Sequence, residues 1–263
     1  MRPPRRRLPR APARDFSLLQ LLPNILTVGA ICAGLSSIRF GVQGEYLLAV
    51  ELIFFAAVID GVDGSLARLL KSNSRMGAEL DSLADFLNFG CAPGLLVYFW
   101  ALQDMRSAGW LAVLALAVCC VLRLARFNVA MKAEDDVLPG PALPPGYFMG
   151  VPSPAGGLLA MLPMYISFAF TSPGGAHEPV LPGIVTCAWL AAVGLLMISR
   201  IPTWSLKAAR IGRENVKFLL VGVAVAGAAL LTYPWETLIL LCAAYAAMVV
   251  LAFVRPPRQR HRG

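Results

Sequence analysis

Charged side chains and histidines are scarce in this chain of 263 residues. Only 14% of the residues are charged, whereas 58% are hydrophobic. Soluble domains carry about 25% charged residues, so the composition is that of a polytopic membrane protein. The two histidines, His177 in a predicted outer loop and His261 in the C-terminal tail, are too few and too far apart for a histidine-ligated zinc site.

Cysteine is also sparse, and its placement excludes a metal or redox motif. None of the six cysteines has CxxC or Cys/His spacing, and all six lie in apolar stretches. We therefore expect them to be small buried hydrophobic residues. Motifs for binding nucleic acid are absent as well, so the net charge of +8 does not indicate a nucleic-acid partner. Basic segments beside a membrane instead favour anionic lipid headgroups.

Long apolar runs fill most of the chain. About 20 apolar residues cross a bilayer, and the sequence has about eight runs of suitable length. We expect an all-α integral membrane protein, a polytopic bundle of about eight transmembrane helices. The predicted spans are residues 21–41, 46–69, 82–102, 108–130, 147–170, 180–199, 216–233 and 235–254.

The basic residues support this division, because Lys and Arg concentrate on the cytoplasmic side of membrane proteins. If both termini are cytoplasmic, every basic residue except Arg39 and Arg106 falls inside. We predict a disordered basic arm (1–15), a transmembrane domain (16–255) and a basic tail (256–263). We do not expect the arm to be a cleaved signal peptide, because no small-residue cleavage site follows an isolated short apolar region.

Two pairs of carboxylates stand out against the apolar background. Asp60 and Asp63 are three residues apart, and Asp81 and Asp85 are four apart. On α-helices these spacings place both members of a pair on one face. Acids within membrane helices face a bundle interior or a wet cavity and indicate function. Four such acids at a common point require bound cations, so we predict a divalent-metal site toward the cytoplasmic face.

Small residues beside these acids indicate where a ligand lies. Gly61, Gly64 and Ser65 leave one helix surface nearly bare. Close helix packing is one explanation of such residues, but packing does not require acids on the same helix. A polyphosphate lying along the helix, contacted by Arg68, explains both.

Further features on the other spans are Pro and Gly signals and a basic pair. We expect a tight turn at Gly77, a kink at Pro93 and a broken helix in the fifth span. The segment 131–146 is too rich in Pro and Gly for regular structure. Arg123 and Arg126 lie three apart near the cytoplasmic end of the fourth span. Snorkelling to the interface explains Arg126 well, while an anionic partner is an equally good explanation of the deeper Arg123.

The acidic stretch resembles a known family. Its fixed positions match the signature of the CDP-alcohol phosphotransferase family, and the stretches LPNILT, LDSLADFLNFGCAPG, RLARFN and GVPSPAGG are similar to the bacterial branch that uses L-serine as the acceptor alcohol. The resemblance covers much of residues 21–157. The signature positions are Asp60, Asp63, Gly64, Ala67, Arg68, Gly77, Asp81 and Asp85.

The resemblance implies the roles of individual residues. Asp60, Asp63, Asp81 and Asp85 would ligate two divalent cations, Mg²⁺ or Mn²⁺, and Asp85 would also be the general base. The CDP part of CDP-diacylglycerol would be bound by Asn24, Ile25, Leu26, Thr27, Gly64, Arg68 and Ser74. It further implies a homodimer in a bacterial inner membrane, with the site open to the cytoplasm.

The expected reaction is transfer of a phosphatidyl group to the serine hydroxyl, with release of CMP. We hypothesise that Arg123 or Arg126 recognises the carboxylate of serine. Glycerol 3-phosphate or an inositol compound as acceptor is the nearest alternative. A cation transporter or a non-catalytic lipid-binding scaffold are alternatives of another class, but a transporter leaves the spacing of Gly64, Arg68 and Gly77 unexplained.

Overall fold

The structure, a computed structural model, describes residues 18–70, 75–135, 147–171, 178–199, 202–204 and 216–254, and these are overwhelmingly helical. Two π-helical turns and one 3₁₀ turn interrupt the longer helices. The helices are α1 (Leu18–Val42), α2 (Tyr46–Leu69), α3 (Arg75–Asp85), α4 (Ala92–Val97), α5 (Arg106–Asp135), α6 (Ser153–Ala160), α7 (Leu162–Phe170), α8 (Gly183–Ile198), α9 (Val216–Thr232) and α10 (Pro234–Val254). The turns are η1 (Phe86–Cys91), η2 (Tyr98–Leu102) and η3 (Gln103–Met105).

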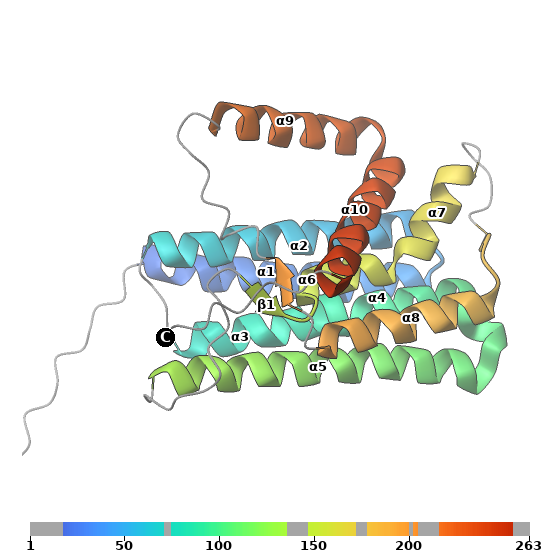
Figure 1. Cartoon of the computed structure of the whole chain (residues 1–263), viewed down its shortest axis with the longest axis horizontal. Coiled ribbons are helices and arrows are strands. Elements are labelled where there is room, and N and C mark those ends of the chain that lie inside the picture. Colours follow the sequence, from blue (N-terminus) through green and yellow to red (C-terminus); the bar gives the residue numbers. More distant parts are fainter. Residues whose placement is uncertain are drawn as a thin grey trace, which may run out of the picture.

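Helices α1 and α2 form a hairpin along one side of the bundle (Figure 1). The connection turns at Gly44, whose φ of +84° is in the left-handed region that favours glycine. Across the hairpin, the Ser37 hydroxyl donates a hydrogen bond of 2.7 Å to the carbonyl of Ala49. The hairpin thus fixes α2, the helix that carries the first pair of acids, against α1.

The predicted third and fourth spans are the two legs of a second hairpin. The chain reverses at η3, where Arg106 has a φ of +48°. Near this reversal the two legs are joined by an edge-to-face contact of Tyr98 and Trp110, with ring centroids 5.6 Å apart. At the other end Asn128 donates a hydrogen bond of 3.1 Å to the Ser82 hydroxyl. The second pair of acids therefore lies on a leg that α5 braces along its length.

One detail of the first leg differs from the prediction, and another was not predicted. Gly77 lies inside α3, so the expected turn at this residue is wrong. The leg then departs from α-helical geometry at η1, directly before the segment that contains Pro93. Proline cannot donate a backbone hydrogen bond to the preceding turn, and the wider π-turn accommodates this loss. The π-turn η1 begins directly after Asp85.

The fifth predicted span is a broken helix, as expected. Helices α6 and α7 are bent by 42° around Met161. Pro163 lacks the N–H that would bond to the carbonyl of Leu159, and the indole N–H of Trp189 on α8 donates to that carbonyl at 2.8 Å. The break is therefore compensated by a neighbouring helix, which is the condition under which membrane proteins tolerate it.

A short antiparallel ladder was not predicted. Strand β1 (Tyr147–Met149) pairs with β2 (Pro202–Trp204). The ladder joins the start of the fifth predicted span to the chain that follows α8. The expectation of no regular structure in 131–146 is wrong at its start, because α5 continues to Asp135. The rest of that segment lies outside the described residues.

Apolar helices capable of crossing a membrane are present. By length and composition, three stretches of the described residues qualify: Leu21–Val42, Met76–Val129, which contains both legs of the second hairpin, and Pro234–Phe253. The bent pair of α6 and α7 would add a fourth. Helices α8 and α9 are apolar but shorter, and α9 lies apart from the bundle, joined to it through α10 (Figure 1).

Close packing in the centre of the bundle depends on small residues. A Cβ added to Gly157 of α6 would lie 2.8 Å from the Cα of Phe89 in η1. On the far side of α6 and α7, Phe168 packs edge-to-face on Trp235 of α10 at 4.9 Å. The core thus holds η1, the segment after Asp85, tightly in place.

The cysteines are free thiols, and Cys120 and Cys242 are buried as expected, whereas Cys32 is exposed.

Candidate functional site

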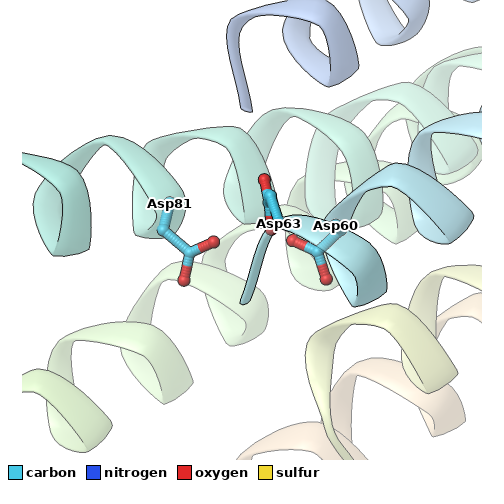
Figure 2. A group of neighbouring side chains, drawn as sticks. All are labelled: Asp60, Asp63 and Asp81. Carbon is cyan, nitrogen blue, oxygen red and sulfur yellow. The ribbon is translucent and has the colours of Figure 1, made fainter. Parts of the chain in front are cut away.

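Three of the predicted metal-ligating acids converge. Asp60 and Asp63 of α2 and Asp81 of α3 each offer a carboxylate oxygen, and these oxygens lie within 4.8 Å of one another. Figure 2 shows the three side chains coming together from the two helices. The spacing of three residues on α2 places Asp60 and Asp63 on one face, and the arrangement of the helices brings Asp81 to it. Oxygen ligands at such separations suit a hard divalent cation.

Asp63 is the most deeply placed acid of the cluster. Its side chain is only 3% exposed. The hydroxyl of Thr27 on α1, itself buried, donates a hydrogen bond of 2.7 Å to Asp63 Oδ2. The other oxygen, Oδ1, is buried and has no hydrogen-bond partner among the described residues. Because a buried carboxylate oxygen without a partner is costly, its place in the cluster fits a cation ligand.

Asp85 lies one turn beyond Asp81, at the end of α3. It is not one of the three acids whose oxygens lie within 4.8 Å. It does interact electrostatically with Asp60, Asp81 and Arg123. Its Oδ1 is buried, and in the described part of the chain no group hydrogen-bonds to it. The geometry therefore places Asp85 beside the cluster with an oxygen available to a ligand or a proton.

The surface of α2 next to the acids is open. A Cβ added to Gly61 or to Gly64 would meet no described atom within 4 Å. Arg68, on the next turn, is exposed and donates a hydrogen bond of 3.2 Å to the Ser65 hydroxyl. That hydroxyl in turn donates to the carbonyl of Gly61 at 2.8 Å. Gly61 and Gly64 have open space beside them, so packing within the described part of this chain does not explain them.

The other residues expected to bind CDP differ from one another in their surroundings. Thr27 points to Asp63, as described above. Ile25 is 61% exposed, and Asn24 and Leu26 are partly buried. Ser74 lies outside the described residues. The assignment of these residues to CDP stays a prediction.

The two arginines of α5 have distinct surroundings. Arg123 is buried, and its Nη1 donates a hydrogen bond to the hydroxyl of Ser153 at the start of α6. Its Nε is also buried and has no partner among the residues described. Arg126 is partly exposed and donates a hydrogen bond of 3.3 Å to the carbonyl of Ser199. The two residues therefore contact different parts of the bundle.

Ser153 is the site residue that sequence reasoning missed. It is completely buried, and its partner Arg123 is 30 residues away in the sequence. A signal existed, because Ser153 is a polar residue between two prolines within an otherwise apolar span. The partnership of Thr27 with Asp63 had no comparable signal, since nothing in either segment indicates which helices adjoin.

Comparison with known proteins supplies the family. The sequence model of the family described as CDP-alcohol phosphatidyltransferase matches residues 20–198. The chain belongs to this family. A second model, described as CDP-alcohol phosphatidyltransferase 2, matches residues 214–249, which cover most of α9 and α10. The family match includes all four acids, and it places the chain among enzymes, in agreement with the motif and against the transporter alternative.

Three of the similar proteins, all named CDP-diacylglycerol–serine O-phosphatidyltransferase, illustrate the likeness. The protein from Mycobacterium leprae is 38% identical over 222 residues, covering 82% of this chain and 69% of the relative. The one from Mycobacterium tuberculosis is 37% identical over 239 residues, covering 89% and 78%. The Bacillus subtilis protein is 33% identical over 183 residues, covering 70% and 89%.

Proposed function

We propose that the protein transfers the phosphatidyl group of CDP-diacylglycerol to the hydroxyl of L-serine, giving phosphatidylserine and CMP. The observation that carries this proposal is the convergence of Asp60, Asp63 and Asp81 within 4.8 Å beside the open glycine face of α2. The chain belongs to the CDP-alcohol phosphatidyltransferase family, and its relatives bear the serine transferase name.

The four acids would hold two divalent cations. Carboxylate oxygens are the ligands that Mg²⁺ and Mn²⁺ prefer, and Oδ1 of Asp63, which is buried and has no hydrogen-bond partner among the described residues, fits this role. Asp60, Asp81 and the second carboxylate oxygen of Asp85 would complete the donor set. When bound, such ions supply neutralisation of pyrophosphate charge and stabilisation of the leaving group.

Asp85 would act as the general base. Its buried oxygen accepts the proton of the serine hydroxyl while the serine oxygen forms a bond to the lipid-linked phosphorus. The bond from this phosphorus to the oxygen of CMP breaks, and CMP leaves with the electron pair. Fixed between Asp81 and the packed π-turn η1, Asp85 contributes chiefly through its position.

The nucleotide-lipid would lie along α2. The open face at Gly61 and Gly64 lets a pyrophosphate approach the backbone beside the acids, and Arg68 supplies a positive charge one turn away. The remaining contacts to CDP would come from the start of α1, namely Asn24, Ile25, Leu26 and Thr27, and from Ser74. The acceptor would enter from the side of α5, where Arg123 provides positive charge.

The proposed setting is the inner membrane of a bacterium. The positive charges outside the spans support about eight crossings with both termini in the cytoplasm, and the acids then lie toward the cytoplasmic side. The transmembrane domain would comprise residues 16–255, between the basic arm 1–15 and the basic tail 256–263. A homodimer is the proposed assembly.

An acceptor assay tests the function. Purified full-length protein is incubated with CDP-diacylglycerol, Mn²⁺ and one alcohol at a time, and CMP release is measured. We expect release with L-serine and formation of phosphatidylserine. If CMP is released with glycerol 3-phosphate or an inositol compound and not with L-serine, the serine assignment is contradicted, but the assignment of phosphatidyl transfer stands. No release with any acceptor would contradict the enzyme assignment.

A further inference from the structure

Arg123 is an unusual residue for the interior of an apolar bundle. Its side chain is only 9% exposed, and a buried guanidinium is costly unless its charge and its N–H groups find partners. Ser153 takes one N–H. The Nε–H is buried and has no hydrogen-bond partner within the described ranges. The Nε–H edge is thus available to an anion, because no described residue hydrogen-bonds to it.

The surroundings of Arg123 connect it to the proposed site. Arg123 interacts electrostatically with Asp85, the proposed base. A guanidinium presents its N–H groups as a planar fork that matches the two oxygens of a carboxylate. An amino acid with a hydroxyl on its β-carbon can therefore place its carboxylate on Arg123 and its hydroxyl toward Asp85.

The segment that carries Ser153 is held firmly. Gly150 has a φ of +75°, and a Cβ at this position would lie 2.6 Å from the carbonyl oxygen of Met197. The next residue, Val151, donates a backbone hydrogen bond of 3.3 Å to the carbonyl of Leu196. These contacts anchor the entrance of α6 on the end of α8. Ser153 consequently fixes one edge of the Arg123 guanidinium and leaves another edge for a ligand.

Arg126 does not share this arrangement. Its hydrogen bond to the carbonyl of Ser199 connects α5 to the end of α8, and its side chain is partly exposed. The hydrogen bond to a backbone carbonyl already gives its guanidinium a partner. The difference between the two arginines separates the alternatives that the sequence leaves open.

We propose that Arg123, positioned by Ser153, is the receptor for the carboxylate of the amino-acid acceptor, and that Arg126 is a structural contact. This proposal rests on the proposed function, since it assigns a subsite to its acceptor. It also assigns Ser153 as a positioning residue for substrate selectivity.

The experiment compares L-serine with L-serinamide, in which a neutral amide replaces the carboxylate. CMP release by the full chain is measured with CDP-diacylglycerol and Mn²⁺. A hydrogen bond to a charged group contributes roughly 1.5–3 kcal/mol, so wild type should prefer serine by roughly 10- to 150-fold in kcat/KM. In Arg123→Gln the preference should fall to within about threefold, with the KM for CDP-diacylglycerol unchanged. Arg123→Lys should be intermediate, and Arg126→Gln should keep the wild-type preference.

Ser153→Ala is the second variant, because Arg123→Gln can impair folding. It keeps the guanidinium and removes the group that orients it, so the KM for serine should rise by about three- to tenfold, with the KM for CDP-diacylglycerol unaffected. The proposal is overturned if Arg123→Gln keeps the wild-type preference for serine over serinamide. If Arg123→Gln is inactive with both acceptors, Ser153→Ala decides, and an unchanged KM for serine in that variant overturns the proposal. Loss of the preference in Arg126→Gln alone would also overturn it.

Failure of the proposed function has a different signature. If wild type releases CMP with glycerol 3-phosphate and not with L-serine, the function itself is wrong. If wild type uses L-serine and L-serinamide equally well, the function stands and the carboxylate subsite is wrong.

Discussion

Helices α2 and α6 both carry runs of glycine and other small residues, yet they use them in opposite ways. On α2, a Cβ added to Gly61 or Gly64 meets no described atom within 4 Å. On α6, a Cβ added to Gly156 would lie 2.7 Å from the sulfur of Met197, and one added to Gly157 would lie 2.8 Å from the Cα of Phe89. Small residues on α2 leave space for a ligand, whereas those on α6 allow close helix packing.

This difference separates function from folding. Changes near the acids of α2 and α3 should affect turnover or ligand binding and leave the fold intact. Changes on α6 should affect stability first. Two stretches that look alike in sequence are therefore distinguished only by what lies opposite them.

The largest effect is expected for Asp85→Asn. Loss of the proton acceptor should lower kcat by about a thousandfold or more, while binding of CDP-diacylglycerol and the thermal midpoint remain near wild type. CMP release and lipid binding by the purified protein measure both quantities. Asp104→Asn is the matched control, because Asp104 is an exposed acid in η3. A rate near wild type for Asp85→Asn would contradict its role as base.

The second effect concerns the open face of α2. Gly64→Leu should raise the KM for CDP-diacylglycerol by up to about 100-fold, because the side chain displaces the pyrophosphate from the acids. The thermal midpoint should not fall, since the structure has room for the side chain. Gly222→Leu on α9 is the control, because its added Cβ also meets no described atom within 4 Å. An unchanged KM in Gly64→Leu would show that the open face is not the lipid site.

Much of this arrangement could be predicted from the sequence, because helical periodicity is a local property. The apolar stretches, the paired acids and the break in the fifth span all follow from residues close together in the chain. The partners of Thr27 and Arg123 could not be predicted in this way. They depend on which helices adjoin and in which register. The β1–β2 ladder likewise has no clear local signal.

A third prediction concerns Thr27, which the family resemblance assigns to CDP and the structure places against Asp63. Groups that orient a metal ligand typically change metal affinity by about 10- to 100-fold when removed. Thr27→Val, which keeps the shape and removes the hydroxyl, should therefore raise the Mn²⁺ concentration for half-maximal binding by about tenfold.

Thr27→Ser is the matched variant, since it restores the hydroxyl, and it should bind Mn²⁺ nearly as wild type does. Titration of the purified protein with Mn²⁺ without substrates separates this effect from turnover. If Thr27→Val binds Mn²⁺ as wild type does but loses affinity for CDP-diacylglycerol, Thr27 is a nucleotide contact and not a positioning residue.

The smallest effect on activity is expected on α6. Gly157→Ala overpacks the contact with Phe89 and should destabilise the protein by about 1–3 kcal/mol, with a lower thermal midpoint and little change in the KM for either substrate below that midpoint. Gly61→Ala is the stability control, because its added methyl group meets open space and alanine favours the helix. Equal midpoints for the two variants would remove the distinction between α2 and α6.

Binding of Mn²⁺ to the full-length protein, followed by electron paramagnetic resonance, tests most directly whether acids of α2 and α3 form one cation site. We expect saturable binding that Mg²⁺ displaces, and strong weakening in both Asp63→Asn of α2 and Asp81→Asn of α3. Binding that is unaffected by either substitution would contradict the account.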